Sequence, residues 1–273
     1  MKKWLIASLL VLVLGVLAAC GDKEKSDGEN NLLSDDVLTV GVTAGPHEEI
    51  IEKIQELAAK DGLTINVEVF TDYVMPNVAL AEKEIDINSF QTEPFFDQMV
   101  KDRKLDLIKV ADTVTFPMGV YSDKVKEISE LKDGAKIGLP SDPTNSGRAL
   151  MLFESAGLIT IEEGVGINAT IHDIDENKNN YEFIELDSAQ IARQLDELDA
   201  AAINTNFAIE YGLSPAEDSI FIEPEDAPFS NLIAVRTESK DEEVIQQFID
   251  LYHSEEVKKF IEESFDGSII ANW

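Results

Sequence analysis

The sequence has few of the residue types on which disulfides, metal sites and many active sites depend. Its one cysteine, Cys20, cannot form an intrachain disulfide. Its three histidines, His47, His172 and His253, are far apart and follow no metal-ligand spacing, so we expect them at the surface or in loops. No glycine-rich phosphate loop and no Gly-x-Ser-x-Gly motif occurs. None of the 54 acidic residues stands out as catalytic. We therefore expect a protein that is not an enzyme and that holds no metal or cofactor.

Basic residues are also scarce. The chain has 22 Lys and Arg against 54 Asp and Glu, which gives a formal net charge of −32. Such a charge repels nucleic acid, so we exclude nucleic acid as a partner. The acidic excess is typical of life at high salt or high external pH, but a well-solvated extracellular surface explains it equally.

Only one long apolar run occurs, and it lies at the N-terminus. Residues 6–19 follow two lysines and are too few to span a bilayer comfortably, as in a signal peptide. Small residues lead into Cys20, as in a bacterial lipobox, where the cysteine is lipidated after cleavage; the alternative is an ordinary secretory signal with an incidental cysteine. We predict a signal peptide over 1–19, a flexible polar tether over 20–36, and a lipid-anchored protein on the extracytoplasmic face of the cell membrane.

The rest of the chain alternates strands and helices. Apolar β-branched runs predict strands at 37–42, 63–70 and 85–90 and from 107 onward. Amphipathic runs between them predict helices at 48–60, 78–82 and 94–101. This order is typical of an open, mostly parallel α/β sheet, whose ligands lie at the carboxyl ends of the strands.

The alternation restarts after an extended segment at 113–121. It continues with a strand at 135–139, a helix at 143–156, strands near 182–186 and 199–203 around a helix at 188–198, a second extended segment at 229–236, and helices near 241–253 and 254–265. We interpret the two extended segments as crossings between two lobes. The prediction is an α/β two-lobe clamshell like the periplasmic binding proteins, with lobe 1 at 37–116 plus 231–273, lobe 2 at 117–230, and the ligand between them. A single doubly wound domain with a decorated edge is the alternative.

Three polar residues are candidates for the ligand site. Arg148 follows the helix start Asp142-Pro143, where backbone N–H groups and a guanidinium could together hold a carboxylate or phosphate. The alternative is that Arg148 pairs with a surface aspartate. Asn204 ends the apolar run 200–203, and Asn231 interrupts the second crossing. An arginine and two buried amides could hold both ends of a zwitterionic amino acid.

Three aromatic residues could form the apolar wall of such a site. Tyr73 and Phe90 come just after predicted strands, and Phe116 lies in the first crossing. Ordinary core packing is the competing explanation for each of them.

Several segments resemble the NlpA/MetQ family of lipoproteins, the substrate-binding proteins of methionine ABC importers. They are Asp72-Tyr73-Val74-Met75-Pro76-Asn77, Asn88-Ser89-Phe90-Gln91, the run 140–148, Ala202-Ile203-Asn204-Thr205 and Asn231-Leu232-Ile233. The similarity runs from about residue 38 to 273. It implies a two-lobe binding protein that holds methionine between its lobes. Arg148 would then take the carboxylate, Asn204 and Asn231 the amino-acid backbone, and Tyr73, Phe90 and Phe116 the side chain.

The sequence departs from this family at two positions of the implied pocket. Thr92 stands where many members have histidine, and Phe116 where many have tyrosine. The resemblance thus leaves open whether the ligand is L-methionine, D-methionine, a methionine dipeptide or another apolar amino acid. It implies an ABC permease as partner, and we expect a monomer. A receptor for another small anion, such as a sulfonate, and an enzyme on the same fold are the alternatives.

Overall fold

The structure, a computed structural model, describes residues 32–224 and 226–273. The predicted signal peptide, Cys20 and most of the tether lie outside the described residues. Among the described helices, none has the length and apolar character needed to cross a bilayer.

The first of two main sheets has six strands in the order β13-β4-β12-β3-β1-β2. The strand β1 pairs in parallel with β2 and β3, whereas β12 runs antiparallel to both β3 and β4. The sheet is therefore mixed rather than mostly parallel as predicted. Its strands are β1 (Val37–Thr43), β2 (Thr64–Phe70), β3 (Ile87–Asn88), β4 (Leu107–Thr115), β12 (Ser230–Arg236) and β13 (Ile270–Ala271).

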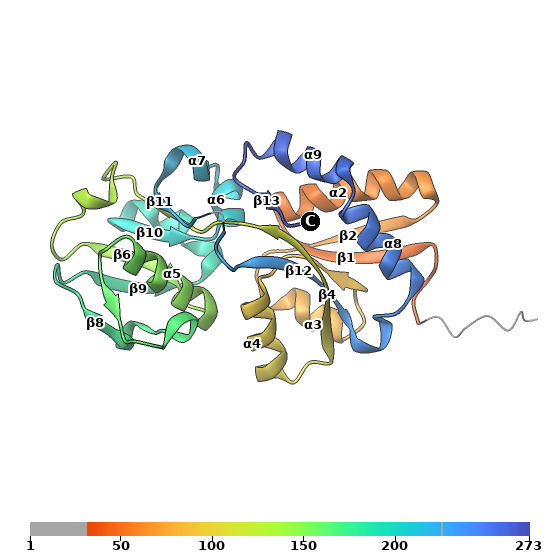
Figure 1. Cartoon of the computed structure of the whole chain (residues 1–273), viewed down its shortest axis with the longest axis horizontal. Coiled ribbons are helices and arrows are strands. Elements are labelled where there is room, and N and C mark those ends of the chain that lie inside the picture. The colour runs from red at the N-terminus through yellow and green to blue at the C-terminus, as the bar shows by residue number, and fades with distance from the viewer. Residues whose placement is uncertain (1–31, 225) are drawn as a thin grey trace, which may run out of the picture. The chain divides into compact units, whose positions relative to one another are not determined.

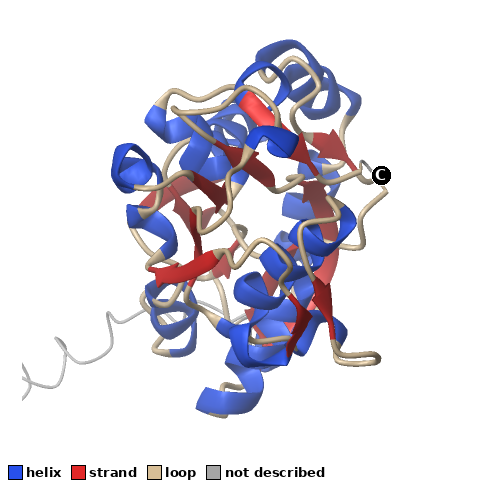
Figure 2. Ribbon diagram, turned by 90° about the vertical axis from the view of Figure 1, so that its left-hand side faces the viewer, coloured by secondary structure: helices blue, strands red, loops and turns tan. Residues whose placement is uncertain are grey.

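Five α-helices accompany this sheet, and a large core lies between them and the strands. Amphipathic sequences produce them: α2, for example, buries Ile50, Ile51 and Ile54 and exposes its acidic side. Together with β1 and β2 it packs against α8 and α9 in one hydrophobic cluster. Figure 2 views the molecule from the side of the second sheet, described next, and shows helices around the strands. The helices are α2 (Pro46–Ala58), α3 (Met75–Ala81), α4 (Glu93–Arg103), α8 (Glu243–Tyr252) and α9 (Glu255–Ser264).

The second main sheet has five strands in the order β11-β5-β10-β6-β9. Here β6 pairs in parallel with β9 and β10, and β5 runs antiparallel to β10 and β11. Its strands are β5 (Gly119–Tyr121), β6 (Lys136–Pro140), β9 (Glu182–Leu186), β10 (Ala200–Ile203) and β11 (Ser219–Ile222), and its helices are α5 (Pro143–Ser155), α6 (Thr205–Tyr211) and α7 (Pro215–Asp218). A short hairpin of β7 (Thr160–Ile161) and β8 (Ile174–Glu176) lies apart from both sheets.

Short 3₁₀ turns complete the secondary structure. One of our helix predictions is wrong, because residues 188–198 form two successive 3₁₀ turns, η5 (Ser188–Gln190) and η6 (Ala192–Glu197), instead of an α-helix. The others are η1 (Ala59–Asp61), η2 (Ile128–Glu130), η3 (Gly166–Asn168), η4 (Ile171–Asp173) and η7 (Thr237–Ser239).

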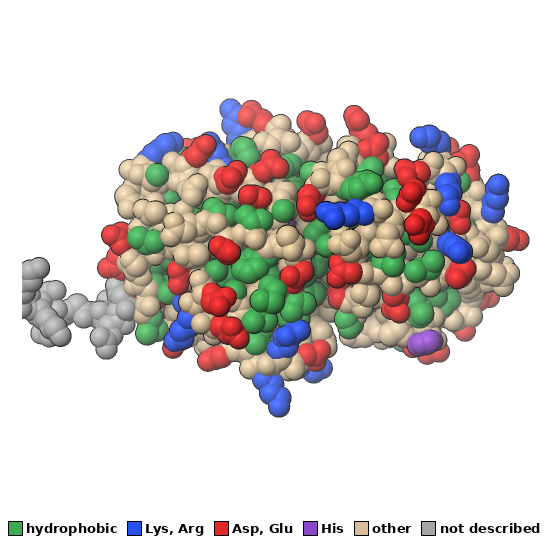
Figure 3. Space-filling view, turned by 180° about the vertical axis from the view of Figure 1, so that it is seen from behind, with side chains coloured by type: hydrophobic (Ala, Val, Ile, Leu, Met, Phe, Trp, Pro, Cys, Tyr) green, Lys and Arg blue, Asp and Glu red, His purple; other side chains and the backbone are tan. Residues whose placement is uncertain are grey.

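The chain passes twice between the two sheets (Figure 1). The first passage is the short segment 116–118 between β4 and β5, and the second joins β11 to β12. Our interpretation of 229–236 as a crossing is wrong for most of its length: residues 230–236 are β12, a central strand of the first sheet, and the passage comes before it. Acidic side chains are spread over the face seen in Figure 3, with fewer basic ones among them.

Candidate functional site

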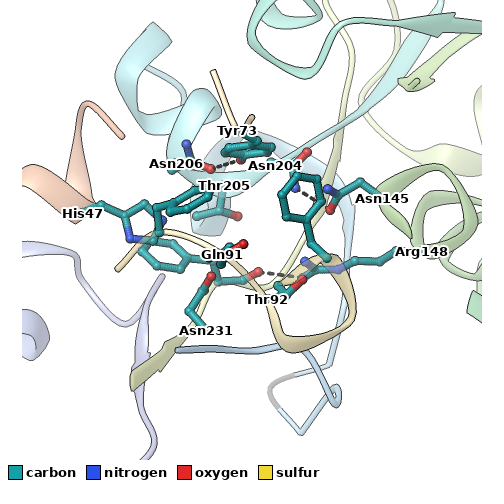
Figure 4. Close-up of a pocket in the computed structure, with 13 residues that line it drawn as sticks. His47, Tyr73, Gln91, Thr92, Asn145, Arg148, Asn204, Thr205, Asn206 and Asn231 are labelled. Carbon is teal, nitrogen blue, oxygen red and sulfur yellow. Dashed lines mark hydrogen bonds between the residues drawn. The ribbon is translucent and has the colours of Figure 1, made fainter. Parts of the chain in front are cut away.

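One cavity is lined by residues from the elements of both sheets and from the first passage between them. It contains about 350 Å³ of space outside the atoms, including the part that opens to solvent. The structure brings all seven sequence-predicted site residues to this cavity. Its lining is His47, Tyr73, Phe90, Gln91, Thr92, Phe95, Phe116, Asn145, Arg148, Asn204, Thr205, Asn206 and Asn231. In Figure 4, His47 and Arg148 lie on opposite sides of it.

Arg148 comes from the buried face of α5, the helix that the sequence predicted over 143–156. Asp142 is its N-cap, and Pro143 opens its first turn. Gly147 is needed just before the arginine, because a Cβ there would collide with the backbone oxygen of Ile167. This close approach of α5 to η3 keeps Arg148 buried at 3% exposure.

The guanidinium of Arg148 is already paired within the protein. Its Nε and Nη2 donate to the two carboxylate oxygens of Glu223 at 2.9 and 2.6 Å, and Nη2 also donates to the backbone oxygen of Phe116 at 2.8 Å. The ring of Phe229 covers the guanidinium at 4.3 Å. Among the described residues, no acceptor engages Nη1. One edge of the guanidinium is therefore free to hold a further anionic group.

Glu223 corrects one step of the sequence argument. That argument required either a ligand anion or a surface aspartate near Arg148, whereas the anion is a buried glutamate, 7% exposed, on the passage from β11 to β12. Glu223 also accepts the backbone N–H of Met118 at 2.7 Å and donates its own N–H to the Met118 oxygen at 3.0 Å. It thus joins the two passages to each other and to Arg148.

Two of the cavity's amides have an oxygen that no described residue engages. Asn204 follows β10, and its Nδ2 donates to Oδ1 of Asn145 at 3.0 Å (Figure 4). Within the described part of the chain, Oδ1 of Asn204 is buried without a hydrogen-bond partner. Asn231, in β12, donates from Nδ2 to the backbone oxygen of Val114 at 3.1 Å, and no described donor engages its Oδ1. These two oxygens can accept hydrogen bonds from a ligand.

Asn206 supplies a donor of the same kind. Its Oδ1 accepts the Tyr73 hydroxyl at 2.6 Å, and its Nδ2 is buried with no partner among the described residues. Within the described ranges 32–224 and 226–273, the cavity therefore has unused donors at Asn206 and Arg148 and unused acceptors at Asn204 and Asn231. Buried polar groups are usually satisfied, so this set predicts a ligand that carries both a negative and a positive group.

Aromatic rings form the apolar wall. The ring centroid of Tyr73 lies 5.9 Å from Phe90, 5.8 Å from Phe95 and 4.9 Å from Phe207. The ring centroids of Phe116 and His47 lie 4.5 Å apart. Burial raises the pKa of the Tyr73 hydroxyl, and the negative charge of Asp142 raises it further. Tyr73 therefore acts as a neutral donor and apolar surface.

His47 corrects a second expectation. The sequence analysis placed all three histidines at the surface or in loops, but His47, at the start of α2, is 3% exposed and lines the cavity. Burial lowers its pKa to about 3, so the imidazole is neutral at pH 7. The sequence signal for this position is a histidine in the turn directly after the first strand, at the edge where ligands lie in α/β sheets.

Two further lining residues make contacts within the protein, Gln91 through its side chain and Thr92 through its backbone. The Gln91 side chain donates to Oδ1 of Asn77 and Asn88 and accepts from Nδ2 of Asn77, all within the first sheet's side of the cavity. Thr92 forms an isolated backbone bridge to Asn231. Gln91 therefore supports the wall, and the Thr92 backbone joins the start of α4 to the strand that carries Asn231.

Sequence reasoning did not single out Asn145, Asn206, Phe95 or Glu223. Asn145 and Asn206 lie within or next to quoted motifs, at helix starts that follow strands, so the edge rule for α/β sheets could have found them. No local signal marks Glu223 among so many acidic residues. Cys20, the predicted lipidation site, lies outside the described residues.

Comparisons with known proteins identify the family and the fold of the chain. Residues 38–273 match the family described as NlpA lipoprotein. The D-methionine-binding lipoprotein MetQ of Salmonella typhimurium is 40% identical over 260 residues, which cover 94% of this chain and 93% of that protein. Among solved structures, a nutrient-binding protein from Burkholderia cenocepacia bound to methionine has a TM-score of 0.85 and 42% identity, covering 86% of this chain and all of that one. The methionine-binding protein MetQ has a TM-score of 0.86 and 39% identity, covering 88% and 99%. The predicted two-lobe α/β fold of the binding proteins is confirmed.

Proposed function

The chain belongs to the NlpA lipoprotein family, and from the chemistry of its cavity we propose that it is a lipid-anchored extracytoplasmic receptor that binds methionine or a close relative and delivers it to an ABC importer. The relatives that carry methionine in their names support the ligand class. A role in binding, rather than in catalysis, fits the same family.

One observation carries the proposal: the cavity holds complementary unused polar groups and an aromatic wall. Nη1 of Arg148 and Nδ2 of Asn206 are free to donate to a carboxylate, and Oδ1 of Asn204 is free to accept from an ammonium group. Tyr73, Phe90 and Phe116 offer the apolar surface that a flexible thioether fills well. Of the common small metabolites, an amino acid with an apolar side chain presents this combination.

A simple anion such as a sulfonate fits this cavity less well. Glu223 already offsets the positive charge of Arg148 at 2.6 Å. A ligand with only a negative charge would enter a site without net positive charge and would leave Oδ1 of Asn204 unsatisfied, which costs about 1–3 kcal/mol. A zwitterion meets neither penalty.

We further propose that the two lobes, 37–116 plus 231–273 and 117–230, close over the ligand through the two passages that Glu223 joins. The Tyr73–Asn206 hydrogen bond, at 2.6 Å, joins one lobe to the other and would form on closure. Small-angle scattering before and after addition of methionine tests this: we expect a smaller radius of gyration with ligand, and an unchanged value under saturating methionine would contradict closure.

Native mass spectrometry of freshly purified protein tests the ligand class, since a tightly held amino acid co-purifies. Calorimetry on protein that has been unfolded, washed and refolded then compares L-methionine, D-methionine, alanine and a methanesulfonate salt. Burial of the side chain beyond the alanine methyl favours methionine by about 2 kcal/mol, or about 30-fold in Kd. Sulfonate binding without amino-acid binding would refute the proposal.

The anchor is tested separately through Cys20. We expect Cys20→Ala to release a folded body from the membrane fraction, because stable anchoring needs at least two lipid signals, and a lipidated cysteine supplies them. Cys20→Ala protein that stays with the membranes would exclude the lipoprotein anchor.

A further inference from the structure

A chain of three side chains fixes the direction of the Asn204 amide. Asp142 accepts the backbone N–H of Asn145 at 3.0 Å and its Nδ2 at 2.9 and 3.1 Å. Oδ1 of Asn145 then accepts from Nδ2 of Asn204 at 3.0 Å. All three residues are buried or nearly so, and Asn145 and Asn204 line the cavity.

The direction of this chain follows from what each atom is able to do. Oδ1 of Asp142 receives a backbone N–H, so it is an acceptor, and Asn145 must turn its nitrogen toward it. The oxygen of Asn145 must then face Asn204, and Asn204 donates a hydrogen bond to it from its own side-chain nitrogen. The remaining end of Asn204, Oδ1, is left without a partner among the described residues. This deduction does not depend on how the two ends of an amide are assigned.

We propose that Asp142 and Asn145 are positioning residues that hold Asn204 as a hydrogen-bond acceptor, so that the cavity selects ligands with an amino group over their 2-oxo analogues. The proposal rests on the function proposed above, because it concerns the same cavity. Neither residue needs to touch the ligand. Their role is to prevent the Asn204 amide from turning over and offering a donor in place of an acceptor.

The consequence for ligand choice follows directly. The ammonium group of methionine donates to Oδ1 of Asn204. In 4-methylthio-2-oxobutanoate a carbonyl oxygen takes its place, so two acceptors would face each other. The two compounds share the carboxylate and the thioether chain, so contacts at Arg148 and at the aromatic wall are matched. We expect wild-type protein to prefer methionine by about 100-fold, the upper part of the effect of one unsatisfied buried group.

Asp142→Asn tests whether Asp142 fixes the direction of the Asn204 amide. It keeps the helix start, since Asn caps a helix as well as Asp does. In the variant the capping oxygen still faces the Asn145 N–H, and the new amide nitrogen takes the place of Oδ2, which accepts from Nδ2 of Asn145 at 3.1 Å. That nitrogen is a donor, so Asn145 can turn its own oxygen toward position 142, and the direction of the chain is no longer fixed. We expect the ratio of the two dissociation constants to fall by about tenfold or more. Asp187→Asn is the matched control: it removes the same charge from another N-cap nearby that does not line this cavity, and it should leave the ratio unchanged.

The ratio separates positioning from mere structural support, because a loosened fold weakens both ligands alike. Asn145→Ala is a second variant that frees the Asn204 nitrogen and keeps the backbone contact to Asp142, and the ratio should fall there too. An unchanged ratio in both variants, or a wild-type protein that binds the two compounds equally, overturns the proposal. If wild type binds no methionine at all, the proposed function fails instead.

Discussion

Removal of the Arg148 guanidinium should affect folding and binding separately. The side chain is buried and contacts Glu223 through two nitrogens, so Arg148→Met leaves a buried carboxylate without its partner. Breaking a buried pair in this way lowers the free energy of unfolding by about 3–5 kcal/mol. Methionine is the better replacement than alanine, because it retains the apolar stem beside Phe229.

The double variant Arg148→Met/Glu223→Gln should recover most of this stability. Glutamine keeps an oxygen for the N–H of Met118 and removes the unpaired charge. Replacement of both members of a buried pair is often close to neutral in stability. Binding should not recover, because the donor at Nη1 is still missing. Loss of a charge pair with the ligand carboxylate costs about 2–5 kcal/mol, which is about 30-fold to several thousand-fold in Kd.

Urea denaturation of ligand-stripped protein measures the first effect, and calorimetry with L-methionine on the stable double variant measures the second. Stripping matters, since a bound ligand raises the apparent stability of whichever variant retains it. Wild-type methionine affinity in the double variant would remove Arg148 from the site. Wild-type stability in Arg148→Met would show that Glu223 does not depend on the arginine. Arg148→Lys should regain charge but not full affinity, because lysine lacks the planar fork.

Three other outcomes are expected. Burial lowers the pKa of His47 to about 3, below its unfolded value of about 6.5; the stability it contributes is therefore present above pH 6.5 and is lost as pH falls toward 3, by about 1.4 kcal/mol per pH unit. The His47→Gln protein should accordingly lose stability less steeply between pH 6 and pH 4 in urea titrations, and equal slopes would contradict the assignment. Thr92→His adds a ring to the cavity wall and should weaken methionine binding by about 1–3 kcal/mol through overpacking; calorimetry showing tighter binding would mean that the wall is underfilled. With a net charge of −32, Tm should rise with sodium chloride at pH 7, since salt screens self-repulsion, and a flat response would show that the charges are compensated.

Local signals predicted the elements that carry the site. Asp142 and Pro143 mark the start of α5 in sequence, and the structure begins that helix at Pro143 with Asp142 as its cap. The run of small and apolar residues before Asn204 likewise predicts β10, which ends at Ile203. Caps and apolar periodicity act within a few residues, so the sequence shows them directly.

Sheet membership depends on distant residues and was predicted less well. The sequence correctly predicted that residues 229–236 are extended. Nothing within this segment, however, shows that it pairs with β3 and β4 in the first sheet. The stretch 188–198 has the composition of a helix, yet it forms 3₁₀ turns. Asp187 precedes them as the N-cap, and its side chain accepts the backbone N–H of Ala189. Tertiary packing decided both cases.

The partners of the site residues were the hardest part to predict. Arg148 and Glu223 are 75 positions apart in sequence and meet only because the second passage runs beside α5. The sequence argument offered a ligand anion or a surface aspartate as the partner of Arg148, whereas its fixed partner is the buried Glu223. The residue nevertheless lines the cavity, for a reason that the sequence does not contain: Glu223 and Phe116 occupy two of its nitrogens and leave the third.

On the proposed function, this arrangement also explains how a strongly acidic protein would hold a carboxylate. Glu223 offsets the charge of Arg148 and fixes its orientation, so the guanidinium acts through a directed pair of N–H groups more than through net charge. In the proposed site, Asp142 would act in the same way at the other end of the ligand, because it orients Asn145 and, through it, Asn204. In each case an acid, buried for Glu223 and half-buried for Asp142, would set the direction of a polar group without presenting its own charge to the ligand. Recognition then depends on the direction of hydrogen bonds, which the acidic surface does not disturb.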